Sequence, residues 1–254
     1  MTEVKDMTVL ITGASSGIGE ACSRRFSKEG ARVILAARRL DRLRSLAATL
    51  PSDCLPLELD VSNRDKVTKT IAGLPPEWRD IDVLINNAGL SRGLDRFHEA
   101  SLDDWEEMID TNIKGLLYLS RIIAPLMVKR GRGHIINIGS IAGHEVYPRG
   151  NVYCATKHAV DAITKGMRLD LVETPVKVST VDPGLVQTEF SMVRFRGDVD
   201  RAKSVYQGYR PLGGDDIADA VFWIASRPDH VQVAEIVIFP SAQASAAVTH
   251  KQFE

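Results

Sequence analysis

The chain has 254 residues, of which 44% are apolar and 26% are charged, and its formal net charge is −1 with a pI of about 6.6. This composition allows a sizeable core and implies no disordered tract, and the length suits one large α/β domain or two small ones. Because the charge is balanced and no basic amphipathic stripe is present, we expect neither a nucleic-acid partner nor a membrane surface, but a small-molecule partner.

Neither the cysteines nor the histidines form a disulfide or metal-binding pattern. Cys22, Cys54 and Cys154 are an odd number without CxxC spacing, so we expect reduced thiols. The histidines lack paired spacing such as HxxxH, and the sequence indicates no metal site. The uncharged apolar run 122–128 is too short to span a bilayer and the first residues carry no signal-peptide pattern, so we expect a cytoplasmic protein.

Short apolar runs alternate with amphipathic segments from the first strand to the last. The pattern predicts strands at 8–12, 32–37, 54–59, 81–85, 135–138, 176–181 and 234–239. Helices are expected between them at 20–28, 41–50, 63–72, 101–128, 152–172 and 215–225. This alternation predicts one doubly wound Rossmann domain over residues 1–254, with a seven-stranded parallel sheet and helices on both faces.

A turn rich in small residues follows the first strand and opens a helix. A helix N-terminus presents free N–H groups and a positive dipole end, and small residues let a pyrophosphate approach them. The glycine spacing differs from the GxGxxG pattern, and a purely structural turn is the alternative. The residues predicted to hold a dinucleotide here are Gly13, Ser15, Ser16, Gly17, Ile18 and Gly19.

Two arginines, Arg38 and Arg39, end the second strand about twenty residues after the last glycine of that turn. At this point an acidic residue accepts the ribose 2′-hydroxyl of NAD, whereas arginine pairs with the 2′-phosphate of NADP. The pair therefore favours NADP, with a solvated pair at the start of the next helix as the alternative.

Two further strand ends carry small or polar residues where ligands collect in parallel sheets. Asp60 and Val61 end the third strand, and Asn87, Ala88 and Gly89 follow the fourth. Helix capping and turn chemistry could also explain these residues. In the helix predicted over 101–128, the Asn-and-Gly interruption at 111–115 should mark a bend, close packing or a function.

Tyr153 and Lys157 are four residues apart, so a helix places the phenol and the ammonium on one face. A free phenol has a pKa of about 10 and is a poor proton-transfer group at neutral pH. A cation about 4 Å away contributes roughly 4 kcal/mol at an effective dielectric near 20, so Lys157 is expected to supply most of the lowering of the phenol pKa. Ser140 ends the run 133–140, which is predicted to be a buried strand that emerges into a Gly-containing turn, and its hydroxyl is placed to reach the phenol.

These motifs together resemble those of the short-chain dehydrogenase/reductase family over essentially the whole chain. The resemblance implies a catalytic tetrad of Asn112, Ser140, Tyr153 and Lys157. In similar enzymes the serine holds the substrate carbonyl, the tyrosine exchanges a proton, the lysine binds the nicotinamide ribose and the asparagine anchors a water. It also implies that Pro183, Gly184, Val186 and Thr188 contact the nicotinamide carboxamide.

More narrowly, segments such as 74–78, 104–110 and 189–198 resemble the NADP-dependent 3-hydroxy acid dehydrogenase branch, to which sulfoacetaldehyde reductases are similar. The family position of a mobile substrate lid falls at about 189–209. A C-terminal tail at about 240–254 departs from the usual family pattern, and the resemblance implies a homotetramer.

Arginines in and near the lid predict an anionic substrate, because a guanidinium grips carboxylate or sulfonate with forked hydrogen bonds. Arg149, Arg194 and Arg196 are the candidates, and each is otherwise a surface charge. The predicted substrate-binding residues are Ser140, His144, Tyr147, Arg149, Tyr153, Phe190 and Arg194.

The sequence thus predicts an enzyme acting on CH–OH groups that passes hydride between NADP(H) and a small anionic aldehyde or its hydroxy acid. Sulfoacetaldehyde with isethionate, malonic semialdehyde with 3-hydroxypropionate, and serine-type 3-hydroxy acids all fit. One alternative is a reductase of an apolar or acyl-carrier-bound ketone. An alternative of another class is a non-catalytic NADP-sensing protein.

Overall fold

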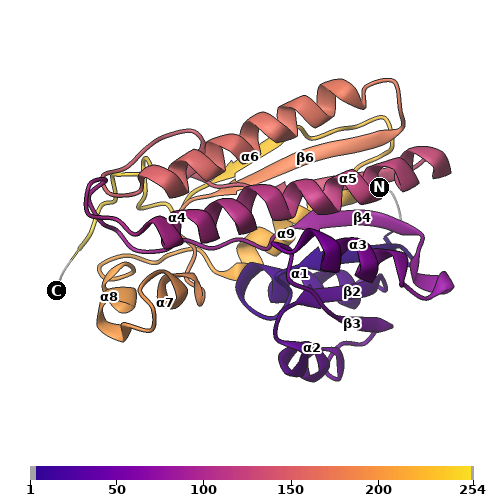
Figure 1. Ribbon diagram of the computed structural model, residues 1–254, viewed down its shortest axis with the longest axis horizontal. Helices are drawn as coiled ribbons and strands as arrows, with labels where there is room; N and C mark the ends of the chain where they lie inside the picture. Colours follow the sequence, from indigo (N-terminus) through magenta and orange to yellow (C-terminus); the bar gives the residue numbers. More distant parts are fainter. Residues whose placement is uncertain (1–3, 253–254) are drawn as a thin grey trace.

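The computed structural model describes residues 4–252, and within this range seven strands form one sheet in which every neighbouring pair is parallel (Figure 1). The strand order is β3-β2-β1-β4-β5-β6-β7. The strands are β1 (Thr8–Thr12), β2 (Arg32–Ala37), β3 (Cys54–Glu58), β4 (Ile81–Asn86), β5 (Gly133–Ile138), β6 (Val176–Pro183) and β7 (Glu235–Ile238). The predicted doubly wound parallel sheet is confirmed.

Helices cover both faces of this sheet, which explains why all five residues of β1 are buried. One face packs on α1 (Gly17–Lys28), α2 (Leu40–Ala47) and α9 (Gly214–Ala225), with Phe26 and Leu43 among the buried residues. The other face packs on α3 (Arg64–Ala72) and α5 (Leu116–Arg130). The sheet therefore separates two hydrophobic layers, and its strand ends stay free to build a site.

The order of the strands reverses between β1 and β4, which lie side by side although β2 and β3 separate them in the chain. Such a reversal leaves a crevice at the carboxyl ends of the strands, where open α/β sheets bind their ligands. The glycine turn after β1 and the segment after β4 both lie at this point. The topology therefore brings the predicted nucleotide-binding segments together.

The long helix expected over 101–128 is interrupted, as predicted, at its Asn-and-Gly segment. Helix α4 (Leu102–Ile109) passes into the π-helical turn η2 (Asp110–Gly115) and then into α5. A Cβ on Gly115 would lie 2.7 Å from Val61 Cγ2, so the turn packs closely against the loop that follows β3. Single π-helical turns occur frequently at functional sites.

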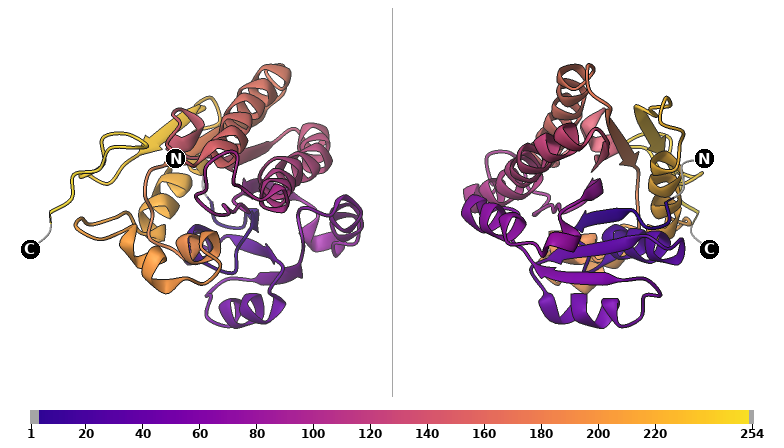
Figure 2. Two further views of the ribbon diagram at one scale, coloured as in Figure 1. Left: turned by 60° about the vertical axis from the view of Figure 1, so that its left-hand side comes forward. Right: turned by 90° about the vertical axis from the view of Figure 1, so that its right-hand side faces the viewer.

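The predicted lid contains two short helices, α7 (Phe190–Arg194) and α8 (Val199–Ser204), and it lies beside the C-terminal tail (Figure 2). The Gln252 backbone N–H donates to the Gly208 carbonyl at 2.8 Å, and the Lys251 ammonium lies 5.8 Å from the centroid of the Tyr209 ring. The tail therefore packs on the end of the lid segment.

Helix α6 (Asn151–Asp170) carries the Tyr-x-x-x-Lys motif along the outer edge of the second layer (Figure 1). The predicted boundaries of most elements agree within three residues with those of the structure. Among residues 4–252, no helix combines the length and the apolar character needed to cross a membrane.

Candidate active site

A cavity of about 550 Å³ opens at the carboxyl edge of the sheet, and it is lined by residues from nearly every segment predicted to contribute. The glycine turn, the end of β2, the segment after β4, the end of β5 and helix α6 all reach it. The predicted residues that line it are Gly13, Ser15, Ser16, Gly17, Ile18, Arg38, Arg39, Asp60, Val61, Asn87, Ala88, Gly89, Ser140, Tyr147, Tyr153, Lys157, Pro183, Gly184, Val186, Thr188, Phe190 and Arg194.

The backbone of the glycine turn adopts a conformation that leaves no room for side chains at its glycines. Gly13 and Gly17 adopt φ values of +67° and +57°, which L residues with a side chain rarely adopt. A Cβ on Gly19 would lie 2.4 Å from the Gly13 carbonyl oxygen, so Gly19 keeps the turn folded from beneath the cavity. Since α1 begins at Gly17, its N-terminal N–H groups are available to a phosphate.

Thr12 and Asn87 join the glycine turn to the segment after β4. The Thr12 hydroxyl oxygen accepts hydrogen bonds from the Asn87 and Ala88 backbone N–H groups at 3.0 and 2.9 Å, and the Asn87 amide donates to the Thr12 carbonyl at 2.8 Å. Thr12 was not among the predicted site residues because it reads as the last residue of a buried strand. The contact fixes the two walls of the crevice.

Arg39 is the most highly connected cation at the nucleotide end of the cavity. Its guanidinium donates to the Ser15 and Ser16 hydroxyls at 3.0 and 2.8 Å and to Glu189 at 3.0 Å. Glu189 also accepts from Arg42 at 2.7 Å, so one lid carboxylate bridges two arginines. No sequence pattern predicts this contact, because Glu189 lies 150 residues from Arg39 along the chain.

The four residues of the implied tetrad meet around the end of β5. Tyr153 and Lys157 lie on α6 and are each 8% exposed, and Ser140 caps the 3-10 turn η3 (Ile141–Gly143). Asn112, in η2, binds both polar backbone groups of Leu90: its Oδ1 accepts from the N–H and its Nδ2 donates to the carbonyl, each at 2.8 Å. Asn112 lies against Gly89 and does not line the cavity. The π-helical turn therefore sets Asn112 behind the cavity wall, beside Lys157.

The expectation that Lys157 supplies most of the lowering of the Tyr153 pKa is wrong for this geometry. The Lys157 ammonium donates to the Ile138 carbonyl at 2.9 Å and lies 6.0 Å from the centroid of the Tyr153 ring. Burial raises the pKa of Tyr153, and the neighbouring Tyr147 adds to this rise, whereas Arg194 and a hydrogen bond with Ser140 lower it. Lys157 is itself affected, because burial lowers its pKa to about 8.

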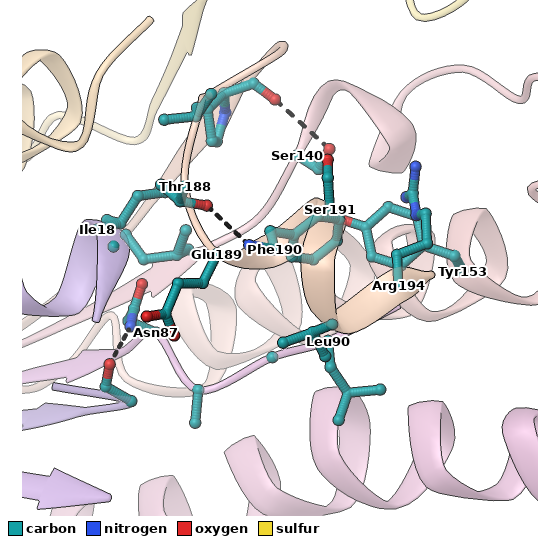
Figure 3. Close-up of a pocket in the computed structure, with 18 of the residues that line it drawn as sticks. Ile18, Asn87, Leu90, Ser140, Tyr153, Thr188, Glu189, Phe190, Ser191 and Arg194 are labelled. Carbon is teal, nitrogen blue, oxygen red and sulfur yellow. Dashed lines mark hydrogen bonds between the residues drawn. The ribbon is translucent and has the colours of Figure 1, made fainter. Parts of the chain in front are cut away.

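Helix α7, in the predicted lid, brings Arg194 and Phe190 against Tyr153 (Figure 3). The Arg194 guanidinium carbon lies 5.3 Å from the centroid of the Tyr153 ring and 5.0 Å from that of Phe190, and Nη2 donates to the Tyr147 hydroxyl at 3.0 Å. Its Nε is buried without a hydrogen-bond partner among the described residues. This end of the cavity therefore has aromatic walls and one positively charged side chain, that of Arg194.

Two predicted substrate-binding residues lie outside the cavity. Arg149 is exposed, has a φ of +67°, and borders a separate small hollow that it shares with Asp104. His144 follows the turn η3, which directs its Nε2 toward Asp182 and Glu235 at 3.4 and 3.6 Å. Arg196, the third arginine considered, pairs with Asp104. Arg194 is thus the candidate arginine that reaches the substrate end of the cavity.

Several lining residues of the lid and the tail were not predicted, namely Glu189, Ser191, Val193, Val205, Tyr206, Gln243 and Ala246. The Tyr206 hydroxyl donates to the Val186 carbonyl at 2.9 Å and lies 2.8 Å from the Ser191 hydroxyl. Gln243 accepts from the Leu185 N–H at 2.8 Å. No local pattern marks these residues, because their roles depend on how the lid folds back over the loop after β6.

The family model described as short chain dehydrogenase matches residues 7–198. The chain belongs to the short-chain dehydrogenase family. Within this family it is 48% identical over 244 residues to the NADP-dependent 3-hydroxy acid dehydrogenase YdfG of Salmonella typhimurium, covering 96% of this chain and 98% of the relative. The NADP-dependent 3-hydroxy acid dehydrogenase of Schizosaccharomyces pombe is 42% identical over 251 residues, with 97% of each chain covered.

Two solved structures of serine dehydrogenase show the same fold. A closed form of serine dehydrogenase complexed with NADP+ matches with a TM-score of 0.92 and 46% identity, covering 97% of this chain and 100% of that chain. A serine dehydrogenase from Escherichia coli matches with a TM-score of 0.82 and 42% identity, covering 94% and 100%. The similarity of this short-chain dehydrogenase to these relatives therefore extends over nearly its whole length.

Replacing the buried lysine should stabilise the protein at neutral pH. Since burial lowers the Lys157 pKa from 10.5 to about 8, the ammonium destabilises the folded state below pH 8. We expect Lys157→Met to raise the free energy of unfolding at pH 7 by an amount on the order of 2 kcal/mol. Between pH 8 and 10.5 this gain should shrink, because the folded lysine loses its proton before the unfolded one.

Urea unfolding at pH 7 and pH 10 measures this difference. Lys129→Met, at an exposed lysine on α5, is the control and should change stability by the same small amount at both pH values. A Lys157→Met protein that is less stable than the wild type at pH 7 would contradict the cost assigned to the buried ammonium.

Proposed function

We propose that this protein is an NADP(H)-dependent oxidoreductase that interconverts a small anionic aldehyde and its hydroxy acid. The observation that carries the proposal is Arg194, which lines the same cavity as Tyr153 and Ser140 and donates to the Tyr147 hydroxyl. Relatives named as NADP-dependent 3-hydroxy acid dehydrogenases and serine dehydrogenase support a 3-hydroxy acid as the substrate.

The nucleotide end of the cavity suits the 2′-phosphate of NADP. Arg38 is exposed at the end of β2 and Arg39 is anchored to the glycine turn, so two guanidinium groups line the place where an adenosine ribose is expected. A structural neighbour with NADP+ bound supports the same choice. The glycine turn and the N-terminus of α1 would hold the pyrophosphate.

Removing one of these arginines should weaken NADPH binding far more than NADH binding. A hydrogen bond to a charged group is worth about 1.5–3 kcal/mol, so we expect Arg39→Ser to lower kcat/KM for NADPH by roughly 10–100-fold. The value for NADH should change little. Arg44→Ser, at an exposed position of α2, is the control. Equal losses with the two cofactors would contradict a role for Arg39 at the 2′-phosphate.

The side chains of the tetrad can then carry out the proton chemistry of carbonyl reduction. NADPH supplies the hydride when bound. The Ser140 hydroxyl would hold the carbonyl oxygen, and the Tyr153 phenol would donate its proton to the alkoxide that forms there. Lys157 keeps a positive charge near the phenol, and Asn112 fixes the Leu90 backbone at the cavity wall. In the reverse direction, the phenolate would remove the proton of the alcohol.

The phenol should be required for turnover but not for cofactor binding. General acid catalysis typically contributes 10²–10⁴-fold, so we expect Tyr153→Phe to lower kcat by at least about 100-fold. NADPH fluorescence should give a Kd close to that of the wild type, because the phenylalanine ring preserves the packing against Phe190. A Tyr153→Phe enzyme with wild-type turnover would show that another group supplies the proton.

A cation at one point of an otherwise apolar cavity favours a small substrate with one acid group. A guanidinium can pair with a carboxylate or a sulfonate through parallel hydrogen bonds. The cavity walls near Arg194 are apolar or aromatic, with Leu90, Phe190 and Val193 among them. Carboxylated semialdehydes and serine therefore fit the proposal, and sulfoacetaldehyde fits it through the same contact.

A substrate panel tests the anion preference. Malonic semialdehyde, sulfoacetaldehyde, serine and the uncharged propanal would be compared on the wild type, Arg194→Gln and Arg149→Ala. We expect kcat/KM for the preferred anion to exceed that for propanal by at least about 10-fold and this advantage to disappear in Arg194→Gln. Arg149→Ala should retain it, since Arg149 lies outside the cavity. Propanal as the best substrate would favour the reductase of an apolar ketone instead.

We also propose a homotetramer in the cytoplasm. The support for assembly is a set of apolar side chains left at the surface of α5 and at or just beyond the end of α6, where Leu126, Leu169 and Val172 are 47%, 75% and 77% exposed. Exposed apolar patches of this kind are typical of interfaces between protein chains.

A further inference from the structure

Lid helix α7 places a cation beside the proton donor as well as beside the substrate end of the cavity. Arg194 contacts the faces of Tyr153 and Phe190 and donates to the Tyr147 hydroxyl. Among residues 4–252, no carboxylate lies within ion-pair distance of Arg194. Its charge is therefore not neutralised by the protein and acts on the groups around it.

We propose that Arg194 promotes proton transfer itself, so that the lid completes the proton donor when it packs over Tyr153. This inference rests on the proposed function, in which Tyr153 exchanges the proton. It goes beyond that function because it gives one residue two tasks: Arg194 binds the acid group of the substrate, and its charge makes the phenol a stronger acid.

The charged and titratable groups around the phenol support this second task. On α6, Lys157 lies 6.0 Å from the Tyr153 ring centroid and Cys154 follows Tyr153 in the chain. Tyr147, in the loop before α6, packs against the cluster that contains Tyr153, and Arg194 reaches the Tyr153 ring from α7. Burial, Tyr147 and Cys154 raise the Tyr153 pKa, and Arg194 is the cation that lowers it. Arg194 therefore lowers the Tyr153 pKa because the lid places its guanidinium beside the Tyr153 ring.

The lid is held in this position by contacts with the nucleotide end of the cavity. Glu189, next to α7, pairs with Arg39 and Arg42, and the Tyr206 hydroxyl joins Ser191 of α7 to the Val186 carbonyl. These contacts connect the cofactor-binding residues to the helix that carries Arg194. Closing the lid over a bound cofactor would therefore also bring the guanidinium to the phenol.

Because the acid group of the substrate and the Tyr153 phenol share Arg194, the pH dependence of kcat should differ from that of kcat/KM. When an acid group binds Arg194, part of the positive charge is neutralised and the phenol becomes a weaker acid. The pH dependence of kcat/KM reports the free enzyme and that of kcat reports the enzyme–substrate complex. In the oxidation of serine, the acidic limb of kcat should therefore lie at higher pH than the limb of kcat/KM. For an uncharged alcohol the two limbs should coincide.

The deciding experiment follows oxidation of the uncharged 1-propanol from about pH 6 to pH 11, along the rise of the acidic limb, by the wild type, Arg194→Gln, Arg194→Lys and the control Lys203→Gln. Lys203 is an exposed lysine of lid helix α8, so its variant removes a charge of the same sign from the same segment. We expect Arg194→Gln to move the acidic limb about one unit toward higher pH, with roughly a 10-fold lower rate below the limb. Arg194→Lys should shift it less, and Lys203→Gln not at all.

The uncharged substrate separates this inference from the proposed function. If Arg194→Gln loses the anion preference but keeps the wild-type limb with 1-propanol, the inference is overturned and the function stands. If the limb moves while the anion preference remains, the effect of Arg194 on the phenol stands and its substrate-binding role fails. Phenolate absorbance near 295 nm, taken as the difference from Tyr153→Phe in the NADP+ complex, gives the same titration without turnover. An unchanged midpoint in Arg194→Gln would also overturn the inference.

Discussion

The burial of a phenol and an ammonium on one helix is the constraint on which the site depends. Desolvation disfavours the charged form of each group, so it raises the pKa of Tyr153 and lowers that of Lys157 to about 8. Neither group could exchange a proton efficiently without further charges and hydrogen bonds. The Ile138 carbonyl, the Ser140 hydroxyl and the Arg194 guanidinium provide these, and they come from a strand, a turn and a lid that are far apart in the chain.

The sheet brings these parts together because parallel strands end at one edge. The ends of β1, β4, β5 and β6 each add a segment to the cavity, and the reversal of strand order between β1 and β4 opens the crevice. Close backbone contacts then hold the segments around the cavity in place. Gly19 underlies the Gly13 carbonyl, Thr12 and Asn87 join two walls, and the π-helical turn around Asn112 holds the Leu90 backbone.

The lid connects the two ends of the cavity. Its first residue, Glu189, pairs with Arg39 at the nucleotide end, and Arg194, five residues later, contacts Tyr153 at the substrate end. The C-terminal tail supports this arrangement from outside, through Gln252 on Gly208 and Gln243 on Leu185. Each exposed ion pair is worth little alone, but together these contacts set where the lid rests. The geometry therefore suits an enzyme in which cofactor binding and proton transfer are linked.

The sequence alone determined the α/β class, the strand positions, the glycine turn and the Tyr153–Lys157 pair, because periodicity and spacing are local properties. It also located the interruption at Asn112, since Asn and Gly are poor residues within a helix. Only the tertiary structure decided which arginine faces the cavity, because the direction of a side chain in a loop depends on how that loop folds. Arg149 and His144 point elsewhere, and Arg194 reaches Tyr153. The sign of the change in the Tyr153 pKa was decided in the same way, because burial and the distances between charges arise only when the lid, helix and strands pack together.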